Sequence, residues 1–286
     1  MKQYILSSFV SKFGGGNKAA VVFDDHGLSE LQMLNIAKKN NFSETAYIDL
    51  KDSDKDSFRI RYFTPTEEVD ICGHAALASF QVLKQLGYLN GSTAYHRTKA
   101  GELKVLVEDK AILIEMKKPE LIMRVSKDTI LEMTDLRESD IIAGDSGMID
   151  VISTGLKDII LEVDSLQTLK RMKILKDKMI ETCRKYDLIG MHVVSRETIE
   201  PDSDFCCRNF APAVGIDEES ATGTSNASLL YYMMNKHKAF SYDKVFKVEQ
   251  GYFMDSPSNV YLKADTNNSI FVGGVASIER VEEIQL

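Results

Sequence analysis

One pattern occurs twice in this chain, and the repeat constrains the fold more than any other feature of the sequence. The first copy spans residues 61–79 and the second spans residues 208–228. Each begins Arg-x-Phe-x-Pro, continues through two adjacent glutamates, and reaches a glycine that is followed by small residues. Because the copies lie half of the 286-residue chain apart, we predict a duplicated fold in which both halves contribute to one site.

Each copy predicts a strand, a polar loop and a helix. The Arg-x-Phe alternation is typical of a half-buried strand, and the proline ends the strand because it lacks a backbone donor. Gly73 and Gly223 then open helices whose first turns present free N–H groups, which attract anions. We therefore expect Gly73, Gly223 and Ser225 to contact a small anionic substrate. The alternative is that two similar units recur for packing alone.

The order of the other elements also repeats, which predicts an α/β (α+β) chain of two similar halves. In the first half, a strand at 19–23 precedes a helix that begins at a Ser29 cap and stops at Asn40 and Asn41. In the second half, a strand at 159–161 precedes a long helix that runs from a Ser165 cap to Tyr186.

The length suits two domains, and the isolated charges that follow Pro119 indicate a boundary near that residue. We expect one half at 1–118 and the other at 119–286. The last strand, within 269–280, alternates polar and apolar residues and could pair with either half, so the first half can include it.

Charge and composition exclude several classes of partner. The chain has 35 basic and 43 acidic residues, a net charge of −8 and no basic block, so nucleic acid is not an expected partner. Its four cysteines show no CxxC spacing, which indicates neither a zinc site nor a disulfide framework and favours a reducing cytoplasm. No signal peptide is recognised, and no apolar run reaches the ~18 residues of a membrane span.

Glu44 is the candidate acid/base. It lies between Ser43 and Thr45 at a predicted junction of helix and strand, where partial burial would move its pKa toward neutrality. The same position also suits a solvated glutamate at the entrance of a strand.

Two more titratable residues flank Gly73. His74 lies in the first helical turn, where the helix dipole favours a neutral imidazole that could polarise a substrate carbonyl or carboxylate; alternatively, it merely caps its helix. Cys72 precedes the glycine, where a thiolate is stabilised and could abstract a proton. The matching stretch at 219–224 has no cysteine, so a buried, inert thiol is the preferred interpretation.

In the second copy, Glu219 and Thr224 flank the helix start, and we expect them to orient the substrate. Glu219 could pair with a histidine or a substrate amine, and Thr224 could donate a hydrogen bond. Arg208 could bind the substrate or pair with carboxylates of its own loop, and the ion pair is the preferred interpretation.

Together these residues resemble the phenazine-biosynthesis isomerase (PhzF-like) family, within the diaminopimelate epimerase and proline racemase superfamily. The resemblance extends in order to the closing Gly273-Gly274 strand. It rests on Gly16-Asn17, Ser43-Glu44-Thr45, Arg61-x-Phe63, Cys72-Gly73-His74, Ser153-Thr154-Gly155, Arg208-x-Phe210 and Thr222-Gly223.

The resemblance implies a diaminopimelate epimerase-like fold of two pseudo-symmetric halves, each a curled mixed sheet around a central helix. It also implies an active site in the cleft between them, no cofactor, and a homodimer. By motif, Glu44 matches the general acid/base and His74 the positioning histidine. Glu219 and Thr224 stand where the family's named isomerase has an aspartate and a serine, and Lys18 replaces a usual proline. These departures bear on the shape of the pocket and on the substrate.

The sequence thus predicts a cytoplasmic, cofactor-independent isomerase with no metal, which moves a proton on a small carboxylate-bearing carbon acid through Glu44. The family's named member isomerises trans-2,3-dihydro-3-hydroxyanthranilate. One alternative is a racemase or epimerase that uses Cys72. Another is a non-catalytic protein of the same fold that binds a small anion.

Overall fold

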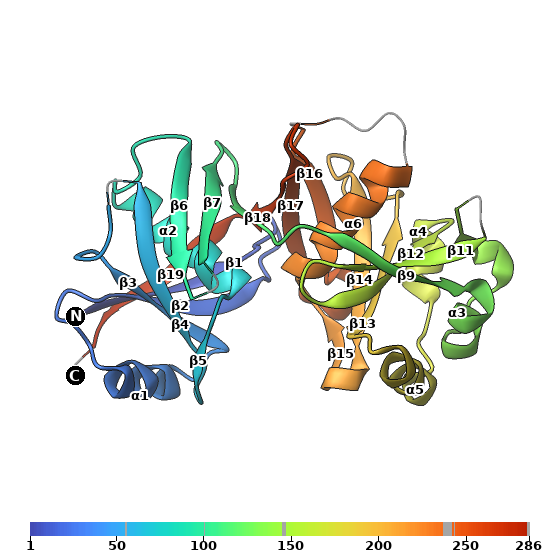
Figure 1. Ribbon diagram of the computed structural model, residues 1–286, viewed down its shortest axis with the longest axis horizontal. Helices are drawn as coiled ribbons and strands as arrows, with labels where there is room; N and C mark the ends of the chain where they lie inside the picture. The colour runs from blue at the N-terminus through green and yellow to red at the C-terminus, as the bar shows by residue number, and fades with distance from the viewer. Residues whose placement is uncertain (55, 100, 145–146, 237–241, 243, 285–286) are drawn as a thin grey trace. The chain divides into compact units, whose positions relative to one another are not determined.

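The computed structural model describes the chain except for residues 55, 100, 145–146, 237–241, 243 and 285–286 (Figure 1). The chain divides into two compact units. The first unit is Met1–Glu115 together with Gly273–Leu286, and the second unit is Met116–Val272. Each unit holds a mixed sheet and a buried central helix, so the predicted fold class is confirmed.

The sheet of the first unit follows the order β19, β1, β2, β3, β4, β6, β7, β8. Neighbouring strands are antiparallel except β2–β3 and β4–β6, which are parallel. The short β5 pairs with β4. The strands are β1 (Lys2–Ser8), β2 (Asn17–Phe23), β3 (Glu44–Asp49), β4 (Ser57–Phe63), β5 (Glu68–Val69), β6 (Thr93–Thr98), β7 (Gly101–Val107), β8 (Ile112–Glu115) and β19 (Ala276–Glu283).

The sheet of the second unit repeats this topology in the order β9, β11, β12, β13, β14, β16, β17. Here β12–β13 and β14–β16 are the parallel neighbours, at the positions that β2–β3 and β4–β6 hold in the first unit. The short β15 pairs with β14 and β10 with β12. The strands are β9 (Glu120–Ser126), β10 (Ile141–Ile142), β11 (Met148–Ser153), β12 (Lys157–Val163), β13 (Gly190–Ser195), β14 (Phe205–Ala211), β15 (Ile216–Glu219), β16 (Phe246–Gln250) and β17 (Ser258–Ala264). A further strand, β18 (Ile270–Gly274), precedes β19 and has residues in both units.

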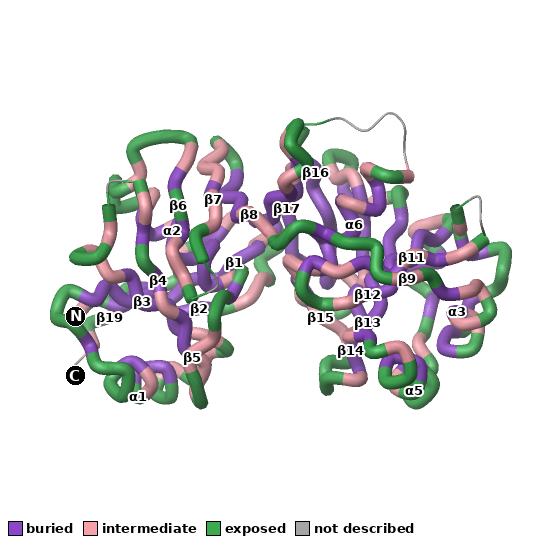
Figure 2. Tube along the Cα trace, viewed as in Figure 1, coloured by how far each residue is buried: buried purple, intermediate pink, exposed green. Residues whose placement is uncertain are grey.

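The two central helices are α2 (Gly73–Gln85) and α6 (Gly223–Lys236), and both begin at the glycines of the repeated pattern. In α2 every residue from Ala75 to Phe80 is buried, and the helix contacts β1, β2, β3, β8 and β19. In α6 every residue from Ser225 to Leu230 is buried (Figure 2), and the helix contacts β11, β12, β13 and β17. A helix that is buried on all sides fits a sheet that curls around it.

Helix α1 (Glu30–Asn40) begins and ends where the sequence predicts. The Ser29 side chain accepts a hydrogen bond from the Gln32 N–H, and the Gln32 side chain accepts one from the Ser29 N–H, which completes a capping box. Asn41 ends the helix in the left-handed conformation, with φ 52°. Asparagine adopts this conformation more readily than most residues.

The long helix predicted from Ser165 to Tyr186 is wrong, because the structure has two helices, α4 (Leu166–Arg171) and α5 (Lys176–Tyr186). The residues between them are extended and hydrogen-bond to the end of α3 (Lys127–Met133) and to the residues that follow it: the Leu175 N–H donates to the Met133 carbonyl, and the Lys173 N–H donates to the Asp135 side chain. These tertiary hydrogen bonds replace helical ones, so helical periodicity alone did not reveal the break.

The last strand pairs with the first. β19, red in Figure 1, runs antiparallel to β1, drawn in blue, so the end of the chain completes the sheet of the first unit. The remaining short elements are 3-10 turns at Glu138–Asp140, Pro212–Val214 and Tyr252–Met254. In the described part of the chain, none of the helices combines the length and the apolar character that a membrane-spanning helix requires.

Candidate active site

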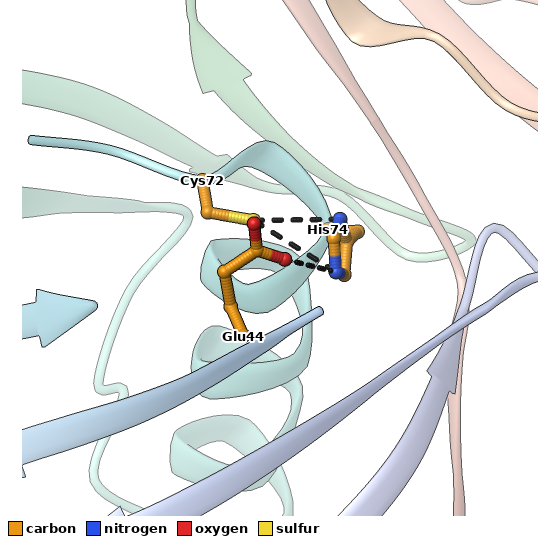
Figure 3. A group of neighbouring side chains, drawn as sticks. All are labelled: Glu44, Cys72 and His74. Atoms are coloured by element: carbon orange, nitrogen blue, oxygen red, sulfur yellow. Dashed lines mark hydrogen bonds and ion pairs between the residues drawn. The ribbon is translucent and has the colours of Figure 1, made fainter. Parts of the chain in front are cut away.

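Three titratable side chains meet at the start of α2 (Figure 3). Glu44 is the first residue of β3, Cys72 is the N-cap of α2, and His74 lies in its first turn. The Glu44 Oε2 atom lies 3.0 Å from Nε2 of His74, and the Cys72 Sγ atom lies 3.4 Å from Nδ1 of the same ring. The side chains of Glu44 and His74 are mostly buried, with 17% and 14% exposed.

The environment favours an ion pair between Glu44 and His74. Burial opposes the imidazolium, but the neighbouring sulfur of Cys72 and the Glu44 carboxylate outweigh it and raise the pKa of His74 to about 10. Burial likewise opposes the carboxylate of Glu44, yet the hydrogen bond and charge of His74 lower the pKa of Glu44 below its usual value. The predictions of a neutral imidazole and of a raised Glu44 pKa are therefore wrong. The Glu44 carboxylate stabilises the His74 imidazolium against the helix dipole, and the imidazolium stabilises the Glu44 carboxylate against burial.

His74 does not cap its helix. The N-cap is Cys72, which has an extended backbone, and its side chain makes no cap hydrogen bond. The His74 carbonyl accepts a 2.7 Å hydrogen bond from the Ser8 hydroxyl, which ties the helix start to β1. A Cβ built on Gly73 meets nothing within 4 Å, so the first turn of α2 lies beside open space in which a ligand could approach its N–H groups.

Arg61 and Arg208 have the same role in their two units. The Arg61 guanidinium holds Glu68 with two bonds of 2.7 Å, and the Arg208 guanidinium holds Glu218 with bonds of 2.9 and 2.8 Å. Arg208 also donates to the carbonyls of Leu169 and Met172 at the end of α4. These contacts favour the interpretation of Arg208 as an ion-pairing residue rather than as a substrate contact.

The other predicted residues of the second copy lie at the start of α6. Glu219 ends β15, and Thr224 occupies the first turn, where its carbonyl accepts a 2.8 Å hydrogen bond from the Thr154 hydroxyl. This bond matches the one from Ser8 to His74 in the first unit. Ser225 is buried and donates a 2.6 Å hydrogen bond to Asp158, so the hydroxyl of Ser225 is committed to the core and faces a carboxylate.

A buried polar network beneath α6 was missed by the sequence analysis. Burial raises the pKa of Asp158, which also accepts hydrogen bonds from Ser225 and the Gly190 N–H. Asn209 bridges Ser225 and His192, with distances of 3.1 and 3.2 Å, and burial lowers the pKa of His192 to about 4. These residues come from β12, β13, β14 and α6, and no local motif links them.

The two units differ in their titratable groups. Parallel registers pair Ala19 with Glu44 in the first unit and Asp158 with Gly190 in the second, so Gly190 holds the position of Glu44. A Cβ on Gly190 would lie 2.0 Å from the Phe210 carbonyl oxygen, which leaves no room for a larger side chain. At the helix starts, Thr222 and Thr224 stand where the first unit has Cys72 and His74. The matching positions of the second unit therefore hold no titratable side chain.

Two further features lie apart from this group. Lys18, which replaces the usual proline after Gly16-Asn17, forms an exposed ion pair with Glu279 at 3.0 Å. A cavity of about 520 Å³ in the first unit is lined by both acidic and basic side chains, and Glu44, Cys72 and His74 are not among them. Its lining residues are Asp52, Arg59, Ile60, Arg61, Glu68, Arg97, Thr98 and Lys99.

Known proteins resemble this chain over most of its length. The family model described as phenazine biosynthesis-like protein matches residues 6–280. An uncharacterized isomerase of Clostridium acetobutylicum is 32% identical, with 87% of this chain and 84% of the relative covered. An uncharacterized isomerase of Bacillus subtilis is 31% identical, with 85% and 84% covered. The expected enzyme class, an isomerase of unspecified reaction, is thereby confirmed.

The solved structures support the same assignment. A Bacillus anthracis phenazine biosynthesis protein of the PhzF family is 26% identical, has a TM-score of 0.80, and aligns over 100% of this chain and 99% of its own. A probable proline racemase of Agrobacterium radiobacter is 11% identical, with a TM-score of 0.57 over 100% of this chain and 93% of its own, and shares the fold alone. The chain belongs to the phenazine biosynthesis-like (PhzF) family.

Proposed function

We propose that this protein is a cofactor-independent isomerase that moves a proton on a small carboxylate-bearing carbon acid, with Glu44 as the acid/base. The observation that carries the proposal is the buried ion pair in which Glu44 Oε2 lies 3.0 Å from His74 Nε2. It stands at a helix start with open space beside Gly73. A carboxylate held ionised beside a potential substrate position meets the requirement for a general base.

In the proposed step, the Glu44 carboxylate takes a proton from the substrate carbon. The C–H bond breaks, an O–H bond forms on Glu44, and the electron pair delocalises into the unsaturated system of the substrate. Glu44 then returns the proton to a different carbon on the same face, so atoms and charge balance. Because the pKa of Glu44 is low, the base is weak but is ionised in the resting enzyme, and His74 keeps it oriented.

The helix start supports a carboxylate as the proposed substrate class. The first turn of α2 has N–H groups without a capping side chain, and the imidazolium of His74 adds positive charge. Both attract a carboxylate. At the start of α6, Glu219 and Thr224 are the proposed orienting residues.

Cys72 supports a second candidate function, a racemase or epimerase. Its sulfur lies 3.4 Å from Nδ1 of His74, the arrangement in which an imidazole activates a thiol. Such a reaction needs an acid on the opposite face of the carbon. The structurally matching position in the second unit is Thr222, which is not a thiol, so the one-base reaction is the better supported of the two.

Deuterium uptake measured by NMR in D2O tests the proposal. The reduced protein is incubated with trans-2,3-dihydro-3-hydroxyanthranilate, proline, hydroxyproline and diaminopimelate, beside the variants Glu44→Gln and Cys72→Ser. The one-base isomerase predicts exchange or isomerisation that Glu44→Gln abolishes, with a loss of at least ~10²-fold, and that Cys72→Ser retains.

The opposite pattern, loss in Cys72→Ser with an active Glu44→Gln, would favour the racemase and reject the role of Glu44. Cys183→Ser serves as a matched control, because Cys183 is a buried thiol in the core of the second unit. Saturable binding of one of these carboxylates without exchange in folded wild-type protein would favour the non-catalytic binding protein.

A further inference from the structure

Glu44, Cys72 and His74 present three different metal-ligand atoms to one another. One carboxylate oxygen, one sulfur and one ring nitrogen all lie within 4.8 Å. Oxygen, sulfur and imidazole nitrogen are the three donor types that Zn²⁺ accepts in proteins. We propose that these three residues form a Zn²⁺ site and that bound zinc blocks the acid/base group.

Two of the ligand distances are close to those of a tetrahedral ion. With Zn–S of about 2.3 Å and Zn–N and Zn–O of about 2.0–2.2 Å, a tetrahedral site separates sulfur from nitrogen by about 3.6 Å and nitrogen from oxygen by about 3.4 Å. In this protein, Cys72 Sγ lies 3.8 Å from His74 Nε2, and Glu44 Oε2 lies 3.0 Å from the same nitrogen. Because Cys72 Sγ also lies 3.4 Å from Nδ1, the His74 ring must rotate to aim its Nε2 lone pair between the sulfur and the oxygen before one ion contacts all three atoms.

The backbone holds these ligands in place before any metal binds. Cys72 and His74 are separated by one residue at the start of α2, whose first turn is tied to β1 by the Ser8 hydroxyl. Glu44 is fixed as the first residue of β3, in register with Ala19. Three protein ligands leave one coordination position for water or a ligand atom, as in zinc sites that are open.

The consequence for activity rests on the proposed function. A Glu44 oxygen that coordinates zinc cannot take a proton from carbon, and His74 can no longer hold the carboxylate by an ion pair. Zinc is thus an inhibitor rather than a cofactor of the proposed isomerase. The second unit offers no equivalent, since Thr222, Thr224 and Gly190 occupy the matching positions.

Cobalt substitution tests the site without any assay of activity. The full-length protein, reduced and freed of chelator, is titrated with Co²⁺ and then with Zn²⁺. We expect a thiolate-to-cobalt charge-transfer band that saturates at one ion per chain and disappears when zinc displaces cobalt. Cys72→Ser and His74→Gln should lose at least ~10²-fold in zinc affinity, since even partners of ligands cost 10–100-fold, whereas Cys183→Ser should match the wild type.

A second measurement uses the wild-type protein alone and remains valid if a variant fails to fold. Iodoacetamide alkylation of Cys72 is followed by peptide mass spectrometry with and without Zn²⁺. Protection of Cys72 supports the site. An unchanged alkylation rate at zinc concentrations that saturate the cobalt displacement, or a charge-transfer band that persists in folded Cys72→Ser, would overturn it.

Deuterium exchange with and without zinc then tests the inhibition. Loss of exchange at one zinc per chain supports it, and full exchange on the zinc-saturated protein overturns it. If the metal-free protein exchanges no substrate proton, the proposed function fails, but the cobalt spectrum and the alkylation result still decide the metal site.

Discussion

Glu44 and His74 fix each other's charge, and at the scale of single residues this coupling is the most testable feature of the molecule. Burial alone would favour the neutral form of each side chain. Together they form a carboxylate and an imidazolium, because His74 stabilises the charge of Glu44, and Cys72 and Glu44 together stabilise the charge of His74, more than burial opposes these charges. Removal of one charge should therefore change the titration of its partner.

Glu44→Gln keeps the size of the side chain and removes its charge, so we expect the pKa of His74 to fall clearly below its wild-type value of about 10. The His74 imidazole resonances, followed by NMR from pH 5 to about 11, check this shift. An unchanged His74 titration in folded Glu44→Gln would contradict the ion pair.

The same coupling predicts how stability depends on pH. The raised His74 pKa contributes stability that is fully present below its usual value of 6.5 and is lost as the pH rises toward about 10. The lowered Glu44 pKa contributes stability that is present above 4.5 and is lost as the pH falls through the lowered value. The unfolding free energy of the wild type should therefore exceed that of Glu44→Gln most between pH 4.5 and pH 6.5. Urea unfolding at a series of pH values measures the difference. A pH-independent difference would reject this linkage.

Gly73 and Gly190 provide a matched pair of substitutions. Gly73→Ala meets no atom within 4 Å, so we expect normal stability but an increased substrate KM, because the methyl group enters the space beside the helix start. Gly190→Ala places a Cβ 2.0 Å from the Phe210 carbonyl oxygen, which should cost about 2–3 kcal/mol of unfolding free energy. Urea denaturation and substrate kinetics distinguish the two results, and a normal KM in Gly73→Ala would argue against a ligand at that helix start.

At the scale of elements, Arg208 holds three segments together. It pairs with Glu218 through two bonds and donates to the Leu169 and Met172 carbonyls where α4 ends. Arg208→Lys keeps the charge but loses the planar fork, so we expect a loss of about 1–3 kcal/mol of unfolding free energy with little change in KM. Arg61→Lys is the matched control because it changes the equivalent ion pair, Arg61 with Glu68, in the first unit. An increased KM at normal stability would instead indicate a substrate contact.

The sequence predicted those elements whose determinants are local. The Ser29 cap, its partner Gln32 and the stop at Asn41 all lie within one short segment, and the helix they delimit is the observed one. The break between α4 and α5 depends on hydrogen bonds from Lys173 and Leu175 to residues about forty positions away along the chain. Helical periodicity contains no information about such partners, so the prediction of one long helix failed.

The same distinction explains the candidate site. Glu44 and His74 were predicted as site residues because each lies in a recognisable motif, but their charges could not be predicted, since the pair joins segments thirty residues apart. Asp158 was missed because its partner Ser225 lies 67 residues away and neither stands in a motif for buried carboxylates.

At the scale of the whole molecule, the repeated topology is completed by strands from different parts of the chain. β9 lies beside β11 in the second unit, and β19 lies beside β1 in the first. β9 immediately follows the first unit in sequence, whereas β19 is contributed by the last residues of the chain. The partner of β19 could not be predicted from its alternation, because the same pattern suits an edge position in either sheet.

This arrangement predicts that removal of the last strand affects one unit only. Truncation after Val275 deletes β19 and leaves β1 as an edge strand with unpaired backbone groups. We expect hydrogen exchange to accelerate at the amides of β1 and β2, and the first unit to unfold at lower urea, while α6 and β12 to β14 keep their protection. Val281→Thr is a suitable control because Val281 is 51% exposed, so this change within β19 should alter neither unit. Equal loss of protection in both units of the truncated protein would show that they fold as one cooperative block, and unchanged protection of β1 would contradict its pairing with β19.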